Sequence, residues 1–187
     1  MKKRQLSIFK NPDNLETERL ILKKITLSSL DDIYEYRSDE KVSRFLLWSP
    51  DVDRDSTKRY LEYVEVLYDK CKFYDFGIFL KENGKMIGTV GFTTINLHKN
   101  TASVGYVLNS KYWGQGIAKE ALEKLIEFGF ETLDLDTLFA KFIEENYASK
   151  RVLEKCGFDF FEKENKLTLI KGKMQRIVIY SLSKIHP

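Results

Sequence analysis

The stretch from Ala102 to Phe130 constrains the fold of this chain more than any other. Val104, Tyr106 and Leu108 recur at every second position in a run rich in β-branched and aromatic residues, which predicts a buried strand. Apolar residues then recur at helical spacing over residues 117–129, which predicts a long amphipathic helix. The solvent face of this helix is expected to hold Lys119, Glu120, Glu123, Lys124 and Glu127.

Two glycines lie in the turn between this strand and this helix. Gly114 and Gly116, with Ala118, leave the backbone N–H groups of the turn uncovered. At a helix N-terminus, unpaired donors and the positive end of the helix dipole favour an anion such as a phosphate or pyrophosphate. Glycines before a helix also serve for chain reversal alone, and the pair by itself does not decide between these two interpretations.

Two further segments extend this pattern. Residues 146–158 predict a short helix closed by Gly157, and residues 16–22 (Glu-Thr-Glu-Arg-Leu-Ile-Leu) open the first predicted strand. Together the three segments resemble the GCN5-related N-acetyltransferases (GNAT), in particular the ribosomal-protein N-terminal acetyltransferases. The family pattern Arg/Gln-x-x-Gly-x-Gly/Ala is matched at Gly116 and Ala118, whereas Trp113 departs from its first position.

Length and charge limit the alternatives. A chain of 187 residues suits one domain with a substantial core, and the resemblance implies a single N-acetyltransferase domain over residues 1–187. The formal net charge of +3 is too small to indicate a nucleic-acid partner. No apolar run approaches the roughly 20 residues of a membrane span, and no signal-peptide core follows the basic residues 1–4. A cytoplasmic protein without a membrane partner is therefore expected.

The two cysteines indicate no metal and no disulfide. Cys71 and Cys156 match neither a metal-ligand spacing nor a disulfide framework. Both are expected to be small buried hydrophobes rather than reactive thiols.

The other apolar patterns predict an α/β (α+β) fold, a mixed sheet with helices on both faces. Asn83-Gly84 between two apolar runs predicts a hairpin. The resemblance implies the GNAT fold, in which a mixed, mostly antiparallel sheet is splayed between its fourth and fifth strands. Strands are predicted at 17–25, 76–80, 86–95, 137–143, 158–161, 167–170 and 177–182, and helices at 30–37 and about 60–68. A compact apolar cluster is predicted from Val42, Phe45, Leu46, Leu47 and Trp48, ended by Pro50.

The resemblance also implies acetyl-coenzyme A as the cofactor. Its pyrophosphate would bind the amides of the glycine turn, and its pantetheine arm would pair with the edge of the strand at residues 106–108. Lys119 is either a further phosphate contact or a solvated helix residue, and Asn146 is a pantetheine ligand, a helix N-cap, or both. The implied cofactor-binding residues are Tyr106, Val107, Leu108, Trp113, Gly114, Gln115, Gly116, Ile117, Ala118, Lys119, Asn146 and Ser149.

The reaction implied is attack of a neutral amine on the thioester, with release of the coenzyme A thiolate. The resemblance implies that the backbone of Val107 or Leu108 stabilises the oxyanion. Leu153 stands where the family often has the tyrosine that serves the thiolate, and Ser149 is expected to donate that hydrogen bond instead. Without the resemblance, Ser149 would be interpreted as a polar residue of the first helical turn.

No general base is assigned from the sequence. Ser103 occupies the position at which many relatives carry a strand glutamate. His98 lies in a predicted turn and His186 in the C-terminal tail, where neither is expected to act. Glu144 and Glu145 precede a helix, where acids commonly complement the dipole, and a water chain is the remaining alternative.

The acceptor pocket is expected where the first helices cover the open side of the splayed strands. Phe45 and Trp48 are candidates to line it, because apolar walls keep an amine neutral. The expected function is acetyl transfer to a protein N-terminal amine by a monomer or homodimer. The alternatives are a small-molecule amine acceptor, such as a polyamine or aminoglycoside, and a module that binds acyl-coenzyme A without turnover.

Overall fold

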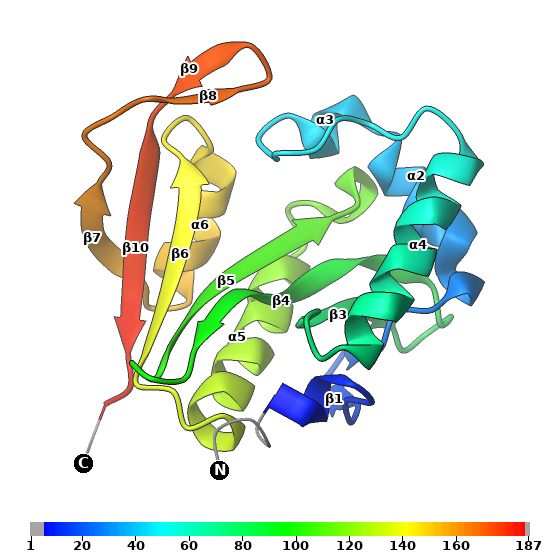
Figure 1. Cartoon of the computed structure of the whole chain (residues 1–187), viewed down its shortest axis with the longest axis horizontal. Coiled ribbons are helices and arrows are strands. Elements are labelled where there is room, and N and C mark those ends of the chain that lie inside the picture. Colours follow the sequence, from blue (N-terminus) through cyan, green and yellow to red (C-terminus); the bar gives the residue numbers. More distant parts are fainter. Residues whose placement is uncertain (1–5, 186–187) are drawn as a thin grey trace.

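A single eight-stranded sheet runs through the computed structural model, which describes residues 6–185 (Figure 1). Its strand order is β1-β2-β3-β4-β5-β6-β10-β7, and within the described part of the chain only β5 and β6 pair in parallel. The strands are β1 (Leu15–Glu16), β2 (Leu20–Lys23), β3 (Asp75–Leu80), β4 (Met86–Asn96), β5 (Thr101–Leu108), β6 (Thr137–Ile143), β7 (Asp159–Lys163) and β10 (Ile177–Ser183).

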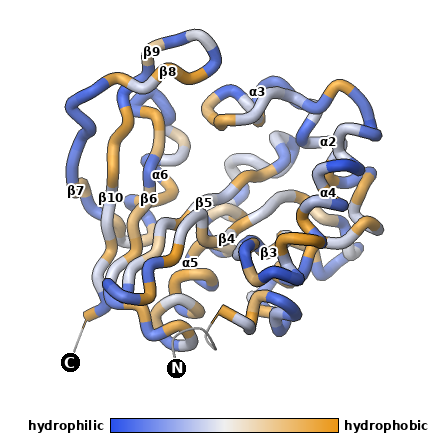
Figure 2. Tube along the Cα trace, viewed as in Figure 1, coloured by the Kyte–Doolittle hydropathy of each residue, from blue (hydrophilic) through white to orange (hydrophobic). Residues whose placement is uncertain are grey.

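Helices cover both faces of this sheet and enclose two apolar clusters. On one face, Leu122 and Leu125 pack in a cluster with Phe92 of β4, and on the other, Leu61 and Val64 pack with residues of the first helices. Figure 2 shows hydrophobic residues along the central strands. The helices and short turns are η1 (Ser7–Phe9), η2 (Leu27–Ser29), α2 (Leu30–Arg37), α3 (Glu40–Ser43), α4 (Arg54–Asp69), η3 (Ser110–Tyr112), α5 (Ile117–Glu127), η4 (Phe128–Thr132) and α6 (Tyr147–Lys155).

The predicted α/β architecture is confirmed, including the Asn83-Gly84 hairpin between β3 and β4, where Gly84 has a φ of +71°. Three details differ. The strand predicted at 17–25 is divided between β1 and β2, because Thr17 turns the chain between them through its hydroxyl bond to the Leu20 N–H. Leu47 is 82% exposed, so it takes no part in the predicted apolar cluster.

The third difference concerns the C-terminal strands. Residues 168–170 form β8, which pairs with β9 (Lys173–Gln175) in a separate two-stranded hairpin and does not join the main sheet. Strands of three residues carry too few positions to establish an alternating pattern, so β9 leaves no sequence signal. The hairpin extends toward α3, on the opposite side of the gap above β5 and β6 (Figure 1).

The sheet is splayed between β5 and β6, which are the fourth and fifth of the predicted strands because the first is divided into β1 and β2. Their parallel pairing runs from Thr101↔Thr137 only to Val104↔Ala140. On its other edge β5 stays paired with β4 as far as Leu108↔Gly88. Residues 106–108 therefore have one backbone edge without a strand partner, and that edge faces the gap.

Candidate functional site

One side chain from β5 spans the gap to α6. The Tyr106 hydroxyl lies 2.9 Å from Ser149 Oγ and donates to the Ser149 carbonyl oxygen at 3.1 Å. The Asn146 side chain caps α6, because its Oδ1 accepts from the Ser149 N–H at 3.2 Å. The cap fixes Ser149 in the first turn of α6 and thereby holds its hydroxyl against Tyr106. Burial raises the pKa of Tyr106, which keeps the phenol protonated at neutral pH.

The glycine turn begins where β5 ends. Gly114 and Gly116 have φ values of +77° and +78°, a backbone conformation in which glycine alone is free of strain. A Cβ built on Gly114 would meet no atom within 4 Å, so the turn is open to its surroundings. The first helical bond of α5 is donated by the Glu120 N–H to the Gly116 carbonyl, which leaves the preceding N–H groups for another acceptor. The turn thus offers space and donors that fit a phosphate.

The start of the chain holds this turn in place. Glu120 Oε1 accepts from the Thr17 hydroxyl at 2.5 Å and from the Arg19 N–H at 2.9 Å. The Arg19 guanidinium bonds Glu120 Oε2 at 2.7 Å and donates to the Gln115 carbonyl oxygen at 3.0 Å. Glu120 was predicted on the solvent face of α5, and this prediction is wrong because its side chain is only 17% exposed and binds the N-terminal segment.

A second set of contacts fixes the segment just before the turn. Ser110 donates to Asp39 Oδ2 at 2.6 Å, which ties η3 to the start of α3. The Glu35 carboxylate of α2 accepts from Lys85 and Lys111, each at 2.6 Å. These two hydrogen bonds lower the pKa of Glu35 to about 2, so the contact persists over the whole physiological pH range. The backbone that enters the turn is therefore held from the opposite face of the sheet.

An Arg19→Ala variant is expected to bind coenzyme A about three- to ten-fold more weakly with little change in kcat. The variant loses a charged hydrogen bond to the Gln115 carbonyl, worth about 1.5–3 kcal/mol when buried but less here because Arg19 is 45% exposed. Isothermal titration calorimetry measures the affinity. Lys81→Ala is the matched control, since Lys81 pairs with Glu16 nearby without reaching the turn. Equal losses in both variants would contradict a role for Arg19 in the turn.

Lys119 and Trp113 are already engaged. The Lys119 ammonium lies 2.7 Å from Glu123 one turn along α5, and its role as a phosphate contact stays a prediction. The Trp113 indole donates to the Leu108 carbonyl oxygen at 2.8 Å and is half exposed. This bond joins the turn to the last residue of β5, which makes strand and turn one rigid unit.

The candidate pocket residues lie on the loop after α3. Trp48 is partly buried against the second apolar cluster, with the Arg37 guanidinium 4.5 Å from its ring centre. Phe45 is partly buried and lies 5.0 Å from the Arg44 guanidinium. Neither is among the described residues that line the nearby groove, and their role as pocket walls stays a prediction.

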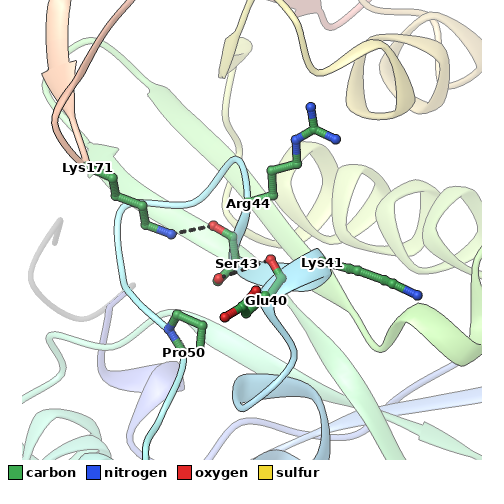
Figure 3. Close-up of a pocket in the computed structure, with 6 residues that line it drawn as sticks. All are labelled: Glu40, Lys41, Ser43, Arg44, Pro50 and Lys171. Atoms are coloured by element: carbon green, nitrogen blue, oxygen red, sulfur yellow. Dashed lines mark hydrogen bonds between the residues drawn. The ribbon is translucent and has the colours of Figure 1, made fainter.

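That groove lies between α3 and the turn of the β8–β9 hairpin (Figure 3). It has a volume of about 440 Å³, and Lys171 reaches across it to donate to the Ser43 carbonyl oxygen at 2.6 Å. Three cations and one carboxylate line it, so its rim is basic. The lining residues are Glu40, Lys41, Ser43, Arg44, Pro50 and Lys171.

The carboxylates and histidines considered as bases in the sequence are exposed wherever the structure describes them. His98 is exposed in the β4–β5 turn, Glu145 is exposed, and Glu144 forms an ion pair with Lys163. His186 lies outside the described residues. A different acid stands out. Asp75, the first residue of β3, is enclosed so that burial raises the pKa of its carboxyl to about 7. No sequence pattern indicates this residue, because its burial depends on which residues cover β3.

Residues 6–185 hold no group of three or more His, Cys, Asp or Glu side chains arranged to bind a metal ion. Over the same residues, no helix has the length and apolar character needed to cross a membrane.

Comparisons with known proteins agree with this geometry. The sequence profile of a family described as acetyltransferase (GNAT) domain matches residues 19–159. The uncharacterised N-acetyltransferase p20 of Bacillus licheniformis is 33% identical over 175 residues, covering 92% of this chain and 97% of that protein.

Solved structures share the fold. A proposed ribosomal-protein-serine acetyltransferase from Vibrio cholerae superposes with a TM-score of 0.82 at 25% identity, covering 93% of this chain and 99% of that one. The microcin C7 self-immunity acetyltransferase MccE, solved in complex with acetyl-CoA and AMP, superposes with a TM-score of 0.79 at 24% identity, covering 90% and 94%.

Proposed function

The chain belongs to the acetyltransferase (GNAT) domain family and is an N-acetyltransferase, and from this premise we propose that its acceptor is the N-terminal amine of a protein. The proposal is supported by the likeness to the Vibrio cholerae protein, which spans nearly the full length of both chains. We also propose that residues 1–187 form one catalytic domain.

GNAT acetyltransferases use acetyl-coenzyme A, which supplies the acetyl group as a thioester when bound. We propose that the open turn around Gly114 and Gly116 holds its pyrophosphate through the backbone N–H groups at the start of α5. The unpaired edge of β5 at residues 106–108 would hold its pantetheine arm, as an added strand is held. Asn146 keeps its side-chain N–H₂ group available for the same arm while its oxygen caps α6.

Two hydroxyl groups would stabilise the leaving thiolate, one by donating a hydrogen bond to it and the other by orienting the first. Ser149 Oγ lies 2.9 Å from the Tyr106 hydroxyl, and either group can be the donor. When the single phenol proton of Tyr106 points to Ser149 Oγ instead of the Ser149 carbonyl oxygen, the proton of Ser149 is free to point toward a thiolate in the gap. Leu153, at the position where the family often has tyrosine, is 1% exposed and packs in the core. The phenol of Tyr106 therefore supports Ser149 from β5, a role that the sequence did not predict.

Ser149→Ala is expected to lower kcat about ten-fold, because the thiolate loses its hydrogen-bond donor, while coenzyme A affinity changes by less than about three-fold. Tyr106→Phe should lower kcat by a similar factor, and the double variant should lose little more than either single one, since the two hydroxyls act as a unit. Steady-state kinetics and calorimetry separate the two quantities. Equal losses in kcat and affinity would contradict the assignment.

The basic rim of the groove supports a peptide acceptor over a polyamine or an aminoglycoside. Lys41, Arg44 and Lys171 outnumber the single Glu40, and like charges repel polycationic substrates. A protein N-terminus carries one amine, and acidic residues following it would match this rim.

The test is acceptor-dependent thiol release from acetyl-coenzyme A with a panel of acidic and neutral N-terminal peptides, spermidine and an aminoglycoside. Acidic peptides are expected to give the highest kcat/KM, with the preference weakening as salt is added. A preference for polycations would overturn the peptide assignment. Coenzyme A binding without any turnover would favour the non-catalytic module instead.

A further inference from the structure

The geometry points to the Asp75 carboxylate as the group that accepts the proton of the acceptor amine. This inference rests on the proposed function. It assigns a general base to a chain that has Ser103 where many relatives carry a strand glutamate.

The side chain of Asp75 lies over a row of two glycines. Asp75 of β3 pairs with Gly91 of β4, and Gly91 pairs with Gly105 of β5. A Cβ built on Gly91 would lie 2.2 Å from Asp75 Oδ1, so the carboxyl occupies the space that a side chain there would fill. Neither Gly91 nor Gly105 carries a side chain, so in this row β4 and β5 place no side chain of their own between Asp75 and the edge of β5 that faces the gap.

This position adjoins the gap. Gly105 directly follows Val104, the last residue of β5 that pairs with β6. Ser103 lies two residues before Gly105 on the same face of β5, and Asp75 stands two strands away on that face, in the row of Gly105. Glycine at 91 is required for this packing, because a Cβ there would meet the Asp75 carboxyl, the Asp75 Cα and the Tyr74 carbonyl oxygen.

The groups that face Asp75 leave its carboxylate without an ion-pair partner among residues 6–185. Tyr36 of α2 and Tyr60 of α4 stand over it, and their burial holds both as neutral phenols. Arg37, which interacts electrostatically with both tyrosines, is committed to Asp51 through bonds of 2.8 and 3.1 Å. Tyr68 of α4 donates to the Asp75 backbone carbonyl at 2.6 Å, which fixes the residue without using its side chain.

The carboxyl is enclosed, and the residue as a whole is only partly buried. A pKa of about 7 suits a general base at neutral pH, because the group is substantially ionised and still holds a proton well. In the step, the amine nitrogen bonds to the acetyl carbon and the carbon–sulfur bond breaks with its electron pair on sulfur. The extra proton on nitrogen passes to Asp75 through bridging water.

The test compares Asp75→Asn with the wild type in pH profiles of kcat/KM between pH 5.5 and 9.5, using two peptides whose N-terminal amines differ in pKa. The wild type is expected to show an acidic limb near pH 7 that is the same for both peptides, beside a second limb that follows the amine. Asp75→Asn should lose the common limb and lower kcat about 100-fold or more. Coenzyme A affinity should stay within about two-fold. Glu62→Gln, an exposed carboxylate on α4, is the control and should behave as the wild type.

Three outcomes would overturn the inference. Asp75→Asn with an unchanged kcat and common limb would show that the carboxylate takes no proton. A raised KM with unchanged kcat would make Asp75 a binding group for the ammonium ion. A uniform loss with the common limb retained would indicate a structural role. Failure of the proposed function would be distinct from all three, because the wild type itself would then acetylate neither peptide.

Discussion

A Gly116→Val variant is expected to lose coenzyme A binding by more than about 100-fold while the protein remains folded. Gly116 has a φ of +78° at the N-cap of α5, and a β-branched residue is strained there. A Cβ built on Gly116 would meet only Arg19 Nη2 at 3.6 Å, so the fold tolerates the added atoms. In the proposed site, those atoms would enter the space for the pyrophosphate. Loss of two hydrogen bonds from backbone N–H groups to the charged phosphate, each worth about 1.5–3 kcal/mol, would account for this loss of affinity.

Gly84→Val is the matched control for backbone strain. Gly84 has a φ of +71° in the hairpin between β3 and β4, and a Cβ there would meet nothing within 4 Å. Both variants should lose about 1–2 kcal/mol of stability in urea unfolding, whereas only Gly116→Val should lose coenzyme A binding in calorimetry. Unchanged affinity in Gly116→Val would mean that the turn serves only to reverse the chain.

Asp75→Asn is expected to be more stable than the wild type at pH 8, by about 2–4 kcal/mol. The unfolded chain ionises this carboxyl near pH 4, whereas the folded protein keeps it protonated up to about pH 7. Between these values the folded state binds more protons, so wild-type stability falls as the pH rises from about 4 to 7 and stays lowered above. Each unit of pKa shift corresponds to about 1.4 kcal/mol, and partial contact with solvent reduces the total.

Urea unfolding at pH 4.5 and at pH 8 checks this expectation. The stability difference between Asp75→Asn and wild type should be large at pH 8 and shrink at pH 4.5, where the wild-type carboxyl is neutral in the folded state. Glu62→Gln should show only a small difference from wild type, since Glu62 is exposed. A pH-independent difference for Asp75→Asn would show that the carboxyl ionises normally in the folded protein. If Asp75 is a desolvated general base, Asp75→Asn should be both more stable and less active than the wild type.

The sequence predicted the parts of the site that depend on local pattern. The strand, glycine turn and helix over residues 102–130 follow from periodicity and glycine placement, and the structure has them as β5, the turn and α5. The capped helix α6 also follows from local signals, with Asn146 at its N-cap.

The parts that escaped prediction depend on contacts between distant segments. The helical pattern of α5 predicts Glu120 on its surface. Glu120 binds Arg19 instead, because the segment between β1 and β2 lies beside α5. The hydroxyls of Tyr106 and Ser149 are 43 residues apart in sequence and meet only across the gap. The pKa of Asp75 is raised because α2 and α4 cover β3, and the spacing of residues in the sequence does not predict that packing.

The short pairing between β5 and β6 affects how firmly the two parts of the sheet are joined. Strand pairing between β1–β5 and the three strands β6, β10 and β7 rests on four residue pairs, beyond which the Tyr106–Ser149 contact crosses the gap. A ligand held by β5, the glycine turn and α6 would touch both parts at once. Its binding energy would then couple the two parts, so that they unfold together. The cofactor would link the two parts of the sheet as well as supply the acetyl group.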